Sequence, residues 1–389
     1  MTDNQSTHLE RVAIKGFKSI KEMDLKMKPI NIVIGANGSG KSNFISLFTF
    51  LRNLSEGKLR TYIEQNGFAN TFFYFGSKVT NQIEIDIEVG FNGYHVKFVH
   101  GSNDDNLVFK EEFCTIVTSG KNFEIVGSKG ESGLLPGTEA QSPAVRNYTR
   151  KYLEDCRVYH FHDTGPTASF KKASSLESVD YLQHDAGNLA AFLYFLKDSE
   201  ETNEFFKSYR DIVDAIKTVA PYFHDFYLEP RGNDGDQKVL LKWIHRDHDE
   251  PFSANQLSDG TARFICMATL FLQPKSLRPK TIILDEPELG LHPAALEVLA
   301  DIVKATAKEN QVICSTQSVT FANQFNPEDF IVVDQEKGAS TFKRVDEVDL
   351  KDWLEDYAMG DIWSKNIIGG ALNGKNRDIS RRPHGRTVC

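Results

Sequence analysis

The sequence predicts an α/β fold with a mostly parallel sheet, and three features lead to that prediction. An apolar run over residues 30–34 precedes the glycine-rich stretch GANGSGKS, which is followed by a helical pattern over about 42–53. A second apolar run, TIILDEP, contains an acidic pair. Short alternating segments, such as QIEIDIEVGF and YHVKFVHG, are separated by Gly and Asn turns. Continuous apolar runs indicate buried parallel strands and alternation indicates antiparallel strands, so both kinds are expected.

The glycine-rich stretch has the composition of a phosphate-binding loop. Its glycines allow a tight turn in which successive backbone N–H groups point at one anion. Lys41 can reach the β- and γ-phosphates, the Ser42 hydroxyl can ligate Mg²⁺, and the N-terminus of the following helix adds a positive dipole end. The order strand, loop, helix is the context that this chemistry needs. The residues expected to contact the nucleotide here are Gly35, Asn37, Gly38, Ser39, Gly40, Lys41, Ser42 and Asn43.

The acidic pair forms a second motif. Residues 282–284 have the apolar character of a central parallel strand, which leaves Asp285 at its C-terminal end. There, Asp285 would hold Mg²⁺ through water, and Glu286 would polarise the attacking water. With Lys41 and Glu286 as catalytic residues, the two motifs together predict a nucleotide hydrolase.

A third motif indicates which class of nucleotide hydrolase this is. The stretch QLSDGTARF resembles the signature motif of ABC-type ATPases, and LSDGT is a variant found in the RecF, SMC and OLD-like branch. The acidic strand, an Asp-loop (ELGLH) and a switch motif (STQS) follow in the ABC order, and the opening RVAIKGFKSIKEMDL is similar to the first strands of RecF-type and SMC-type heads. The resemblance covers most of the chain and implies an ABC-type ATPase head with an antiparallel β subdomain and an inserted helical lobe.

This resemblance also implies a mechanism with ATP and Mg²⁺ as cofactors. In ABC-type heads two protomers enclose two ATP molecules, so Ser258 and Gly260 are expected to close on the nucleotide of the partner in a homodimer. Gln317 stands where most of these ATPases have a His that contacts the γ-phosphate. Because Gln can donate a hydrogen bond but cannot be cationic, slow turnover is expected.

One expected motif is replaced. The strand predicted over 158–161 precedes the place where ABC-type ATPases keep a Gln loop that senses Mg²⁺, and no Gln is present. Either His162 or Asp163 is expected to substitute for it, and a plain turn at the strand end is the alternative. His160 and His162 should face the same side of a strand, but the sequence offers no third metal ligand beside them.

Four parts are expected along the chain. Residues 1–160 form the N-terminal ATPase part with the phosphate-binding loop and the antiparallel subdomain, and 161–255 form a helical lobe with a connecting hairpin. Residues 256–345 carry the signature, the acidic strand and the switch, and 346–389 form a C-terminal helix and a basic, disordered tail. No heptads persist long enough for a coiled-coil arm.

Length, composition and charge limit the kinds of protein that this chain can be. With 389 residues, 40% of them hydrophobic, the chain can bury a substantial core. No stretch approaches the roughly 18 to 20 apolar residues of a membrane span, and the N-terminus lacks a signal pattern, so a cytoplasmic protein without a membrane partner is expected. The net charge of −9 argues against a nucleic-acid coat protein but permits a local basic face.

The motif set resembles stand-alone predicted ATPases of prokaryotic anti-phage systems, which are found beside a nuclease or another toxic effector. This resemblance implies an ATP-dependent sensor and scaffold, a homodimer or higher oligomer that controls a separately encoded effector, expected to be a nuclease. The alternative is a RecF-like ATPase that binds DNA in repair or recombination. A transporter subunit is disfavoured by LSDGT, the missing Gln loop and Gln317, and the chain has no cluster of acidic residues typical of a nuclease.

Overall fold

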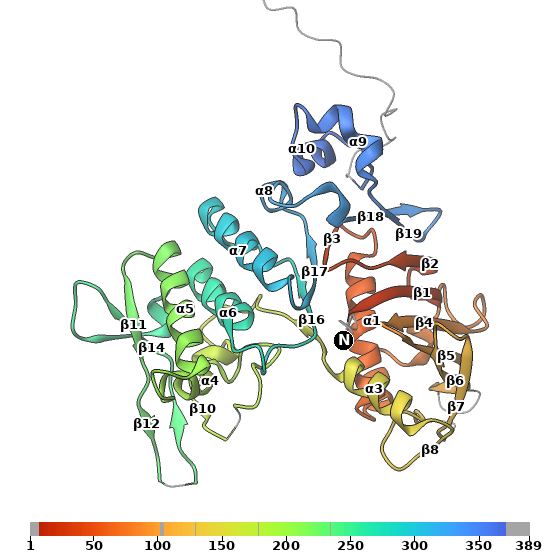
Figure 1. Cartoon of the computed structure of the whole chain (residues 1–389), viewed down its shortest axis with the longest axis horizontal. Coiled ribbons are helices and arrows are strands. Elements are labelled where there is room, and N and C mark those ends of the chain that lie inside the picture. Colours follow the sequence, from red (N-terminus) through yellow and green to blue (C-terminus); the bar gives the residue numbers. More distant parts are fainter. Residues whose placement is uncertain (1–7, 102–104, 129, 178, 234, 371–389) are drawn as a thin grey trace, which may run out of the picture. The chain divides into compact units, whose positions relative to one another are not determined.

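The computed structural model describes residues 8–101, 105–128, 130–177, 179–233 and 235–370 (Figure 1). The chain divides into two compact units, one formed by 1–156 with 313–389 and the other by 157–312. The basic tail that the sequence predicts, from Lys375 to Arg386, lies outside the described residues.

The first unit contains a seven-stranded sheet of order β2-β1-β4-β5-β6-β7-β8, in which all neighbours are antiparallel. Its strands are β1 (Leu9–Phe17), β2 (Ile20–Lys26), β4 (Ile83–Val89), β5 (Asn92–His100), β6 (Leu107–Ile116), β7 (Lys121–Val126) and β8 (Glu139–Ala140). In β4 the isoleucines are buried and the residues between them are only partly covered. The predicted antiparallel subdomain is therefore confirmed.

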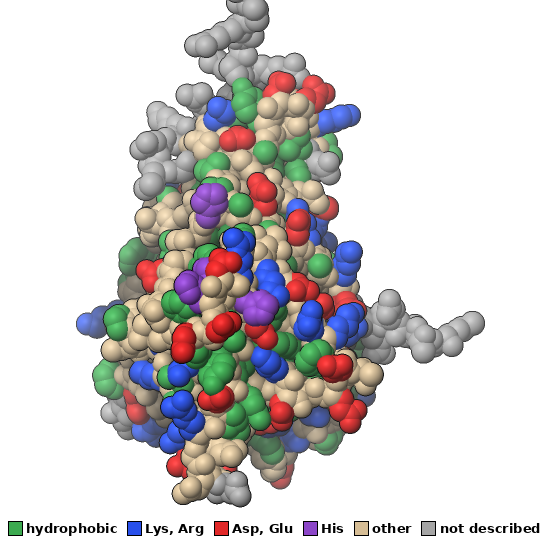
Figure 2. Space-filling view, turned by 90° about the vertical axis from the view of Figure 1, so that its left-hand side faces the viewer, with side chains coloured by type: hydrophobic (Ala, Val, Ile, Leu, Met, Phe, Trp, Pro, Cys, Tyr) green, Lys and Arg blue, Asp and Glu red, His purple; other side chains and the backbone are tan. Residues whose placement is uncertain are grey.

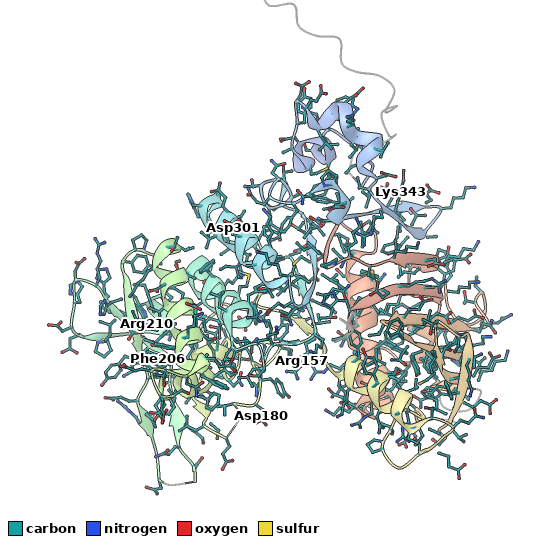
Figure 3. The ribbon with its side chains drawn as sticks, in the orientation of Figure 1. Arg157, Asp180, Phe206, Arg210, Asp301 and Lys343 are labelled. Atoms are coloured by element: carbon teal, nitrogen blue, oxygen red, sulfur yellow. The ribbon has the colours of Figure 1, made fainter. Side chains whose placement is uncertain are left out.

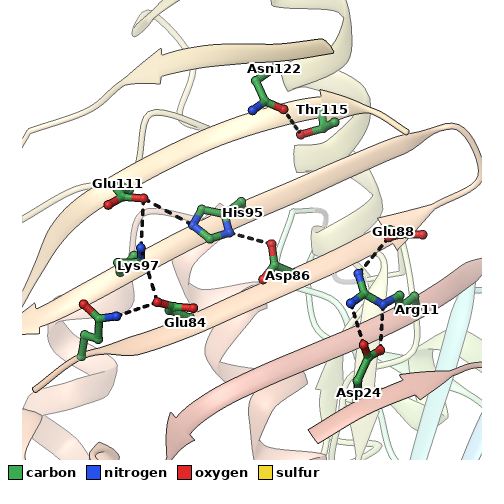
Figure 4. Close-up of polar contacts among 11 residues, drawn as sticks. Arg11, Asp24, Glu84, Asp86, Glu88, His95, Lys97, Glu111, Thr115 and Asn122 are labelled. Atoms are coloured by element: carbon green, nitrogen blue, oxygen red, sulfur yellow. Dashed lines mark hydrogen bonds and ion pairs between the residues drawn. The ribbon is translucent and has the colours of Figure 1, made fainter. Parts of the chain in front are cut away.

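The partly covered face of this sheet carries cross-strand ion pairs (Figure 4). Lys97 lies 3.3 Å from Glu84 and 3.1 Å from Glu111, and His95 lies 2.6 Å from Asp86. Arg11 joins the same face by pairing with acidic groups on the neighbouring strands. Each pair of this kind contributes little by itself, so this face is best described as a solvated strand face held in register by charge.

The first unit also contains strands in the order β19-β18-β3-β17. Their bounds are Ala339–Arg344, Phe330–Glu336, Ile30–Gly35 and Gln311–Thr316 respectively, and most of β17 lies in this unit. β3 and β18 are parallel, with Val33 opposite Ile331, whereas β18 and β19 form an antiparallel hairpin. This arrangement agrees with the expected α/β class, in which the phosphate-binding loop follows a buried parallel strand.

Helix α1 (Lys41–Ser55) forms the centre of this unit's core. Phe50 contacts Phe17 of β1 and Phe98 of β5, with ring centroids 5.6 and 5.5 Å apart, while Phe44 contacts Phe342 of β19 at 5.6 Å. Burying each such ring contributes roughly 1.5–3 kcal/mol. Because α1 packs against strands of both sheets, its N-terminus is held rigidly at the end of β3.

The remaining helices of this unit are shorter or peripheral. They are α2 (Leu59–Gln65), α3 (Pro143–Glu154), α8 (Val319–Ala322), α9 (Glu347–Leu354) and α10 (Met359–Ser364). Helix α3 packs against α1 and the antiparallel sheet, and α10 packs against α8. The C-terminal helical segment expected from the sequence is present here as α9 and α10.

The second unit pairs strands with a helical layer. Strand β9 (Cys156–Tyr159) lies beside β16 (Thr281–Asp285), and α5 (Glu204–Val219) packs on α6 (Asp259–Leu272), which packs on α7 (Pro293–Thr306). Figure 3 shows Phe206 and Arg210 projecting from α5 and Asp301 from α7. The other elements are α4 (Leu189–Lys197), β10 (Ser174–Ser175), β11 (Phe223–Tyr227), β12 (Pro230–Arg231), β13 (Lys238–Val239), β14 (Lys242–His245) and β15 (Pro251–Ser253).

Two expectations about this unit need correction. The strand predicted over 158–161 ends at Tyr159, because the backbone N–H of His160 leaves the ladder and donates to the carbonyl of His184. The helical lobe predicted over 161–255 has its first α-helix only at Leu189, since the Asn188 side chain accepts a hydrogen bond from the backbone N–H of Gln183 and holds the preceding turn. Among the described residues, no helix has both the length and the apolar character needed to cross a membrane.

Candidate functional site

The loop between β3 and α1 requires its glycines. Gly38 and Gly40 have φ values of 78° and 115°, in the region that side chains rarely adopt. A Cβ on Gly40 would clash with the Ser340 hydroxyl, and a Cβ on Gly35 would clash with the carbonyl of Val333. Substitution at either position would therefore push the loop away from the strands that support it at the N-terminus of α1.

Lys41 and Ser39 fit a phosphate in this cradle. The Lys41 ammonium is buried at the end of β3 and donates to the carbonyls of Gly35 at 2.7 Å and Ala36 at 3.1 Å. The Ser39 hydroxyl is buried and has no hydrogen-bond partner in the structure. A phosphate in the loop would supply acceptors for these groups, and Ser42 is exposed at the start of α1, where it could contact a cation.

A set of hydroxyl contacts fixes the loop to neighbouring strands. Ser340 of β19 donates to the carbonyl of Ser39 at 2.6 Å and lies 2.7 Å from the Ser19 hydroxyl. The side-chain amide of Asn43 donates to Ser19 at 2.7 Å.

Neither Ser19 nor Ser340 was predicted from the sequence as a site residue. The only signal for Ser19 was its place in the opening KGFKS, and Ser340 had none.

A groove of about 720 Å³ lies beside the loop. Its lining includes Lys18, Ser19, Asn43, Phe75 and Gly338. The Phe75 ring is 63% exposed and lies against the turn of the β18–β19 hairpin, where a Cβ on Gly338 would come within 2.7 Å of it. An exposed aromatic ring and several polar groups next to a phosphate loop can hold a planar heterocycle.

The switch position also lies in the first unit. Gln317 directly follows β17, the strand next to β3, and is exposed. The next residue, Ser318, caps α8 by accepting a hydrogen bond from the backbone N–H of Phe321 at 3.1 Å. Gln317 is thus held between a buried strand and a capped helix, and its proposed contact with a γ-phosphate stays a prediction.

In the second unit, the acidic pair lies where β16 ends. Residues 282–284 are buried, and Asp285 is the last residue of the strand. Glu286 has a φ of 46°, which costs of order 1–3 kcal/mol for a residue with a side chain and is found most often at functional sites. The backbone thus leaves the extended conformation at Glu286, directly after Asp285.

The signature residues begin helix α6. Ser258 is exposed and caps the helix by accepting a hydrogen bond from the backbone N–H of Thr261 at 3.2 Å. A Cβ on Gly260 would clash with the carbonyl of Gly290 in the Asp-loop, so only glycine allows the two segments to approach. The first turn of α6 therefore presents a hydroxyl and a helix N-terminus, a combination that suits an anion.

Arg263 connects three segments of this unit. Its guanidinium donates to the carbonyls of Phe161 at 3.0 Å, His162 at 2.7 Å and Leu289 of the Asp-loop. A fork of five N–H donors makes such a three-way contact possible, and a lysine could not reproduce it. No sequence pattern marks Arg263, because its partners are backbone carbonyls, two of them about a hundred residues away.

The side chain of His162, and not that of Asp163, lies close to the Asp285 carboxylate. Ligand atoms of His160, His162 and Asp285 lie within 4.8 Å of one another. Asp163 instead accepts a hydrogen bond from the backbone N–H of Gly165 at 2.9 Å and closes its own turn. Partial burial lowers the pKa of His160, and the Asp285 carboxylate opposes this shift. Asp285 is therefore the third side chain of a group that could hold a metal ion, and the sequence did not reveal this grouping.

Comparisons with known proteins place the fold in a family. The chain matches the family model described as "AAA domain, putative AbiEii toxin, Type IV TA system" over residues 30–116 and 161–323, more than half of its length. It is 23% identical over 312 residues to the DNA replication and repair protein RecF of Renibacterium salmoninarum, covering 73% of this chain and 75% of that protein.

Two solved structures of Smc heads share the fold. One is an Smc head bound to the C-winged helix domain of ScpA, with a TM-score of 0.52, 16% identity, and coverage of 86% of this chain and 97% of that one. The other, derived from Pyrococcus furiosus, has an extended coiled coil and is bound to the C-terminal domain of ScpA, with a TM-score of 0.54, 15% identity, and coverage of 90% and 99%. The chain therefore belongs to this AAA-domain family and is an ABC-type P-loop ATPase of the RecF and SMC class.

Proposed function

We propose that this protein binds ATP and Mg²⁺ between two copies of itself, hydrolyses the ATP slowly, and uses the closed dimer to control a separately encoded effector. The observation that carries the proposal is the exposed Ser258 at the capped N-terminus of α6. Because the residue is exposed, its hydroxyl and the positive end of the helix dipole are accessible to a nucleotide held by a second protomer. ATP would then act as a reversible link between the two copies.

Each motif residue has a role in this proposal. Lys41 and the loop amides would neutralise the phosphates, and Ser42 and Asp285 would hold Mg²⁺, Asp285 through water. Glu286 would polarise the attacking water, and Gln317 would donate a hydrogen bond to the γ-phosphate. A neutral donor at that position stabilises developing negative charge less than a cation does, so turnover should be slow.

The effector role rests on family resemblance. The matching family model is described as a putative toxin of a type IV toxin–antitoxin system, which supports action as one of a pair of proteins. We propose that the paired protein is a nuclease and that the ATPase senses phage infection and releases or activates it. Higher oligomers would arise by the association of ATP-linked dimers.

The test compares two variants in phage challenge and in capture of the neighbouring gene product. Glu286→Gln should bind ATP without hydrolysing it and retain the partner when ATP and Mg²⁺ are present, whereas Lys41→Ala should bind neither ATP nor partner. Both variants should lose protection against phage. Full protection by both variants would contradict the sensor role.

A second candidate function has support from the RecF relative, which is described as a DNA replication and repair protein. In that case the closed dimer would bind DNA through a basic face. On the face drawn in Figure 2, Lys and Arg side chains are interspersed with Asp and Glu side chains, so a basic surface would have to lie elsewhere. ATP-dependent DNA binding by Glu286→Gln that weakens steeply with salt would favour this function over the effector role.

A further inference from the structure

We infer that His160, His162 and Asp285 form a binding site for a divalent transition-metal ion, and that this site exists without nucleotide. The three residues belong to one compact unit, so their arrangement needs no second protomer. The proposed Mg²⁺ of ATP hydrolysis is a different ligand, because it would be held by Ser42 and by water on Asp285. A test of this metal site is therefore independent of a test of the proposed function.

The distances suit one ion. The ligand atoms of the three side chains lie within 4.8 Å of one another. A tetrahedral or octahedral ion with bonds of about 2.0–2.2 Å holds its ligand atoms about 3 to 3.5 Å apart. Small rotations of these side chains would close that difference. The two rings already lie near each other, with centroids 6.1 Å apart and an interplanar angle of 39°.

The backbone that carries the ligands is held from several sides. Strand β9 lies beside β16, which brings the segment after Tyr159 to the end of the strand that carries Asp285. The N–H of His160 donates to the carbonyl of His184 at 2.9 Å, and Arg263 fixes the carbonyl of His162 at 2.7 Å. Supporting contacts of this kind orient metal ligands and raise affinity, since less freedom is lost on binding.

The ligand types select the metal. Imidazole nitrogen is a good ligand for Zn²⁺, Co²⁺ and Fe²⁺, whereas Mg²⁺ prefers oxygen ligands and keeps most of its water. Two imidazoles and one carboxylate leave at least one position open to water or another ligand. Because Asp285 is also the proposed Mg²⁺ ligand, a transition-metal ion bound here would occupy the acidic motif directly and change its charge before ATP arrives.

The experiment is calorimetric titration of the full, nucleotide-free chain with Zn²⁺ and, separately, with Mg²⁺. Wild type should bind one tight equivalent of Zn²⁺ and show no comparable binding of Mg²⁺. In His160→Gln and in His162→Gln the tight equivalent should weaken at least tenfold, whereas His224→Gln, an exposed histidine of β11, should leave it unchanged. Absence of a tight equivalent, or its persistence in both site variants, would overturn the inference.

A second measurement uses only the wild type, so its result does not depend on whether the variants fold. Diethyl pyrocarbonate modifies accessible imidazoles, and peptide mass spectrometry reports each histidine separately. Zn²⁺ should protect His160 and His162 and leave His224 reactive. Equal modification of all three histidines with and without Zn²⁺ would contradict the site. Neither readout uses ATP, so failure of ATP-linked dimerisation would leave this result intact.

Discussion

At the scale of single residues, the site depends on backbone conformations that only particular side chains tolerate. Gly38 and Gly40 both have positive φ, but they differ in their surroundings. A Cβ on Gly38 would meet nothing within 4 Å, whereas one on Gly40 would clash with the Ser340 hydroxyl. The two glycines therefore separate the cost of backbone strain from the cost of steric overlap.

This difference gives a matched pair of variants. Gly38→Ala should lower the free energy of unfolding by about 1–2 kcal/mol, the cost of a left-handed residue with a side chain. Gly40→Ala should lower it by roughly 1–3 kcal/mol more, through overpacking against Ser340, and should weaken ATP binding more severely. Urea denaturation and titration with a fluorescent ATP analogue measure both effects. Equal losses in the two variants would show that the contact with Ser340 does not constrain the loop.

A buried carboxyl gives a pH-dependent prediction. Desolvation raises the pKa of Asp329 from 3.8 to about 6, so the native state holds this proton more tightly than the unfolded chain does. The stability that this group contributes is therefore complete below about pH 4 and is lost as the pH rises through about 6. At pH 7.5, Asp329→Asn should be more stable than wild type by about 1–2 kcal/mol.

The check is urea denaturation of wild type and Asp329→Asn at pH 7.5 and pH 4.5. The advantage of the variant should shrink at the lower pH, where the wild-type carboxyl is protonated. Asp301→Asn, an exposed position on α7, serves as the control and should show no such trend. An advantage of the same size at both pH values would contradict the assigned protonation.

At the scale of elements, Arg263 ties the start of α6 to two loops. It contacts the carbonyls of Phe161 and His162 on one side and that of Leu289 on the other. A movement of the signature helix would therefore be transmitted to the segment that carries His162. Arg263 contacts His162 at its backbone carbonyl and not at its imidazole, so it is a positioning residue.

Replacing this residue should loosen both loops. Arg263→Lys keeps the charge but loses the fork of donors, so the tight Zn²⁺ equivalent should weaken by roughly tenfold while the stoichiometry stays at one. Hydrogen exchange over residues 160–165 and 286–292 should become faster. Arg246→Lys, at an exposed turn of the same unit, is the control. Unchanged exchange and affinity in Arg263→Lys would show that the loops are held by other contacts.

At the scale of the whole molecule, the sequence was most informative where a motif is contiguous. The loop from Gly35 to Ser42 and the strand ending at Asp285 could be predicted because glycine spacing and apolar runs act locally. The bond between Ser19 and Ser340 joins residues 321 positions apart, and the three carbonyls around Arg263 leave no pattern in the side chains. Such contacts follow from packing of the folded chain, which one sequence does not display.

The possible metal site could be predicted only in part from the sequence. It consists of His160, His162 and Asp285. The two histidines were visible as a pair, but the third ligand was assigned to another motif, and only the pairing of β9 with β16 brings them together. Asp285 could therefore take part in two metal-binding arrangements, one with nucleotide and one without. This sharing would let the metal bound before ATP influence how the ATPase dimerises.

The proposed function requires that ATP complete its site only between two copies of the chain. Mass photometry of Glu286→Gln, with and without ATP and Mg²⁺, tests it most directly, with Lys41→Ala as the matched control. For Glu286→Gln we expect monomers without ATP and dimers or larger even-numbered assemblies with ATP, and for Lys41→Ala we expect monomers in both conditions. Monomers of Glu286→Gln at saturating ATP, or dimers of both variants regardless of ATP, would contradict it.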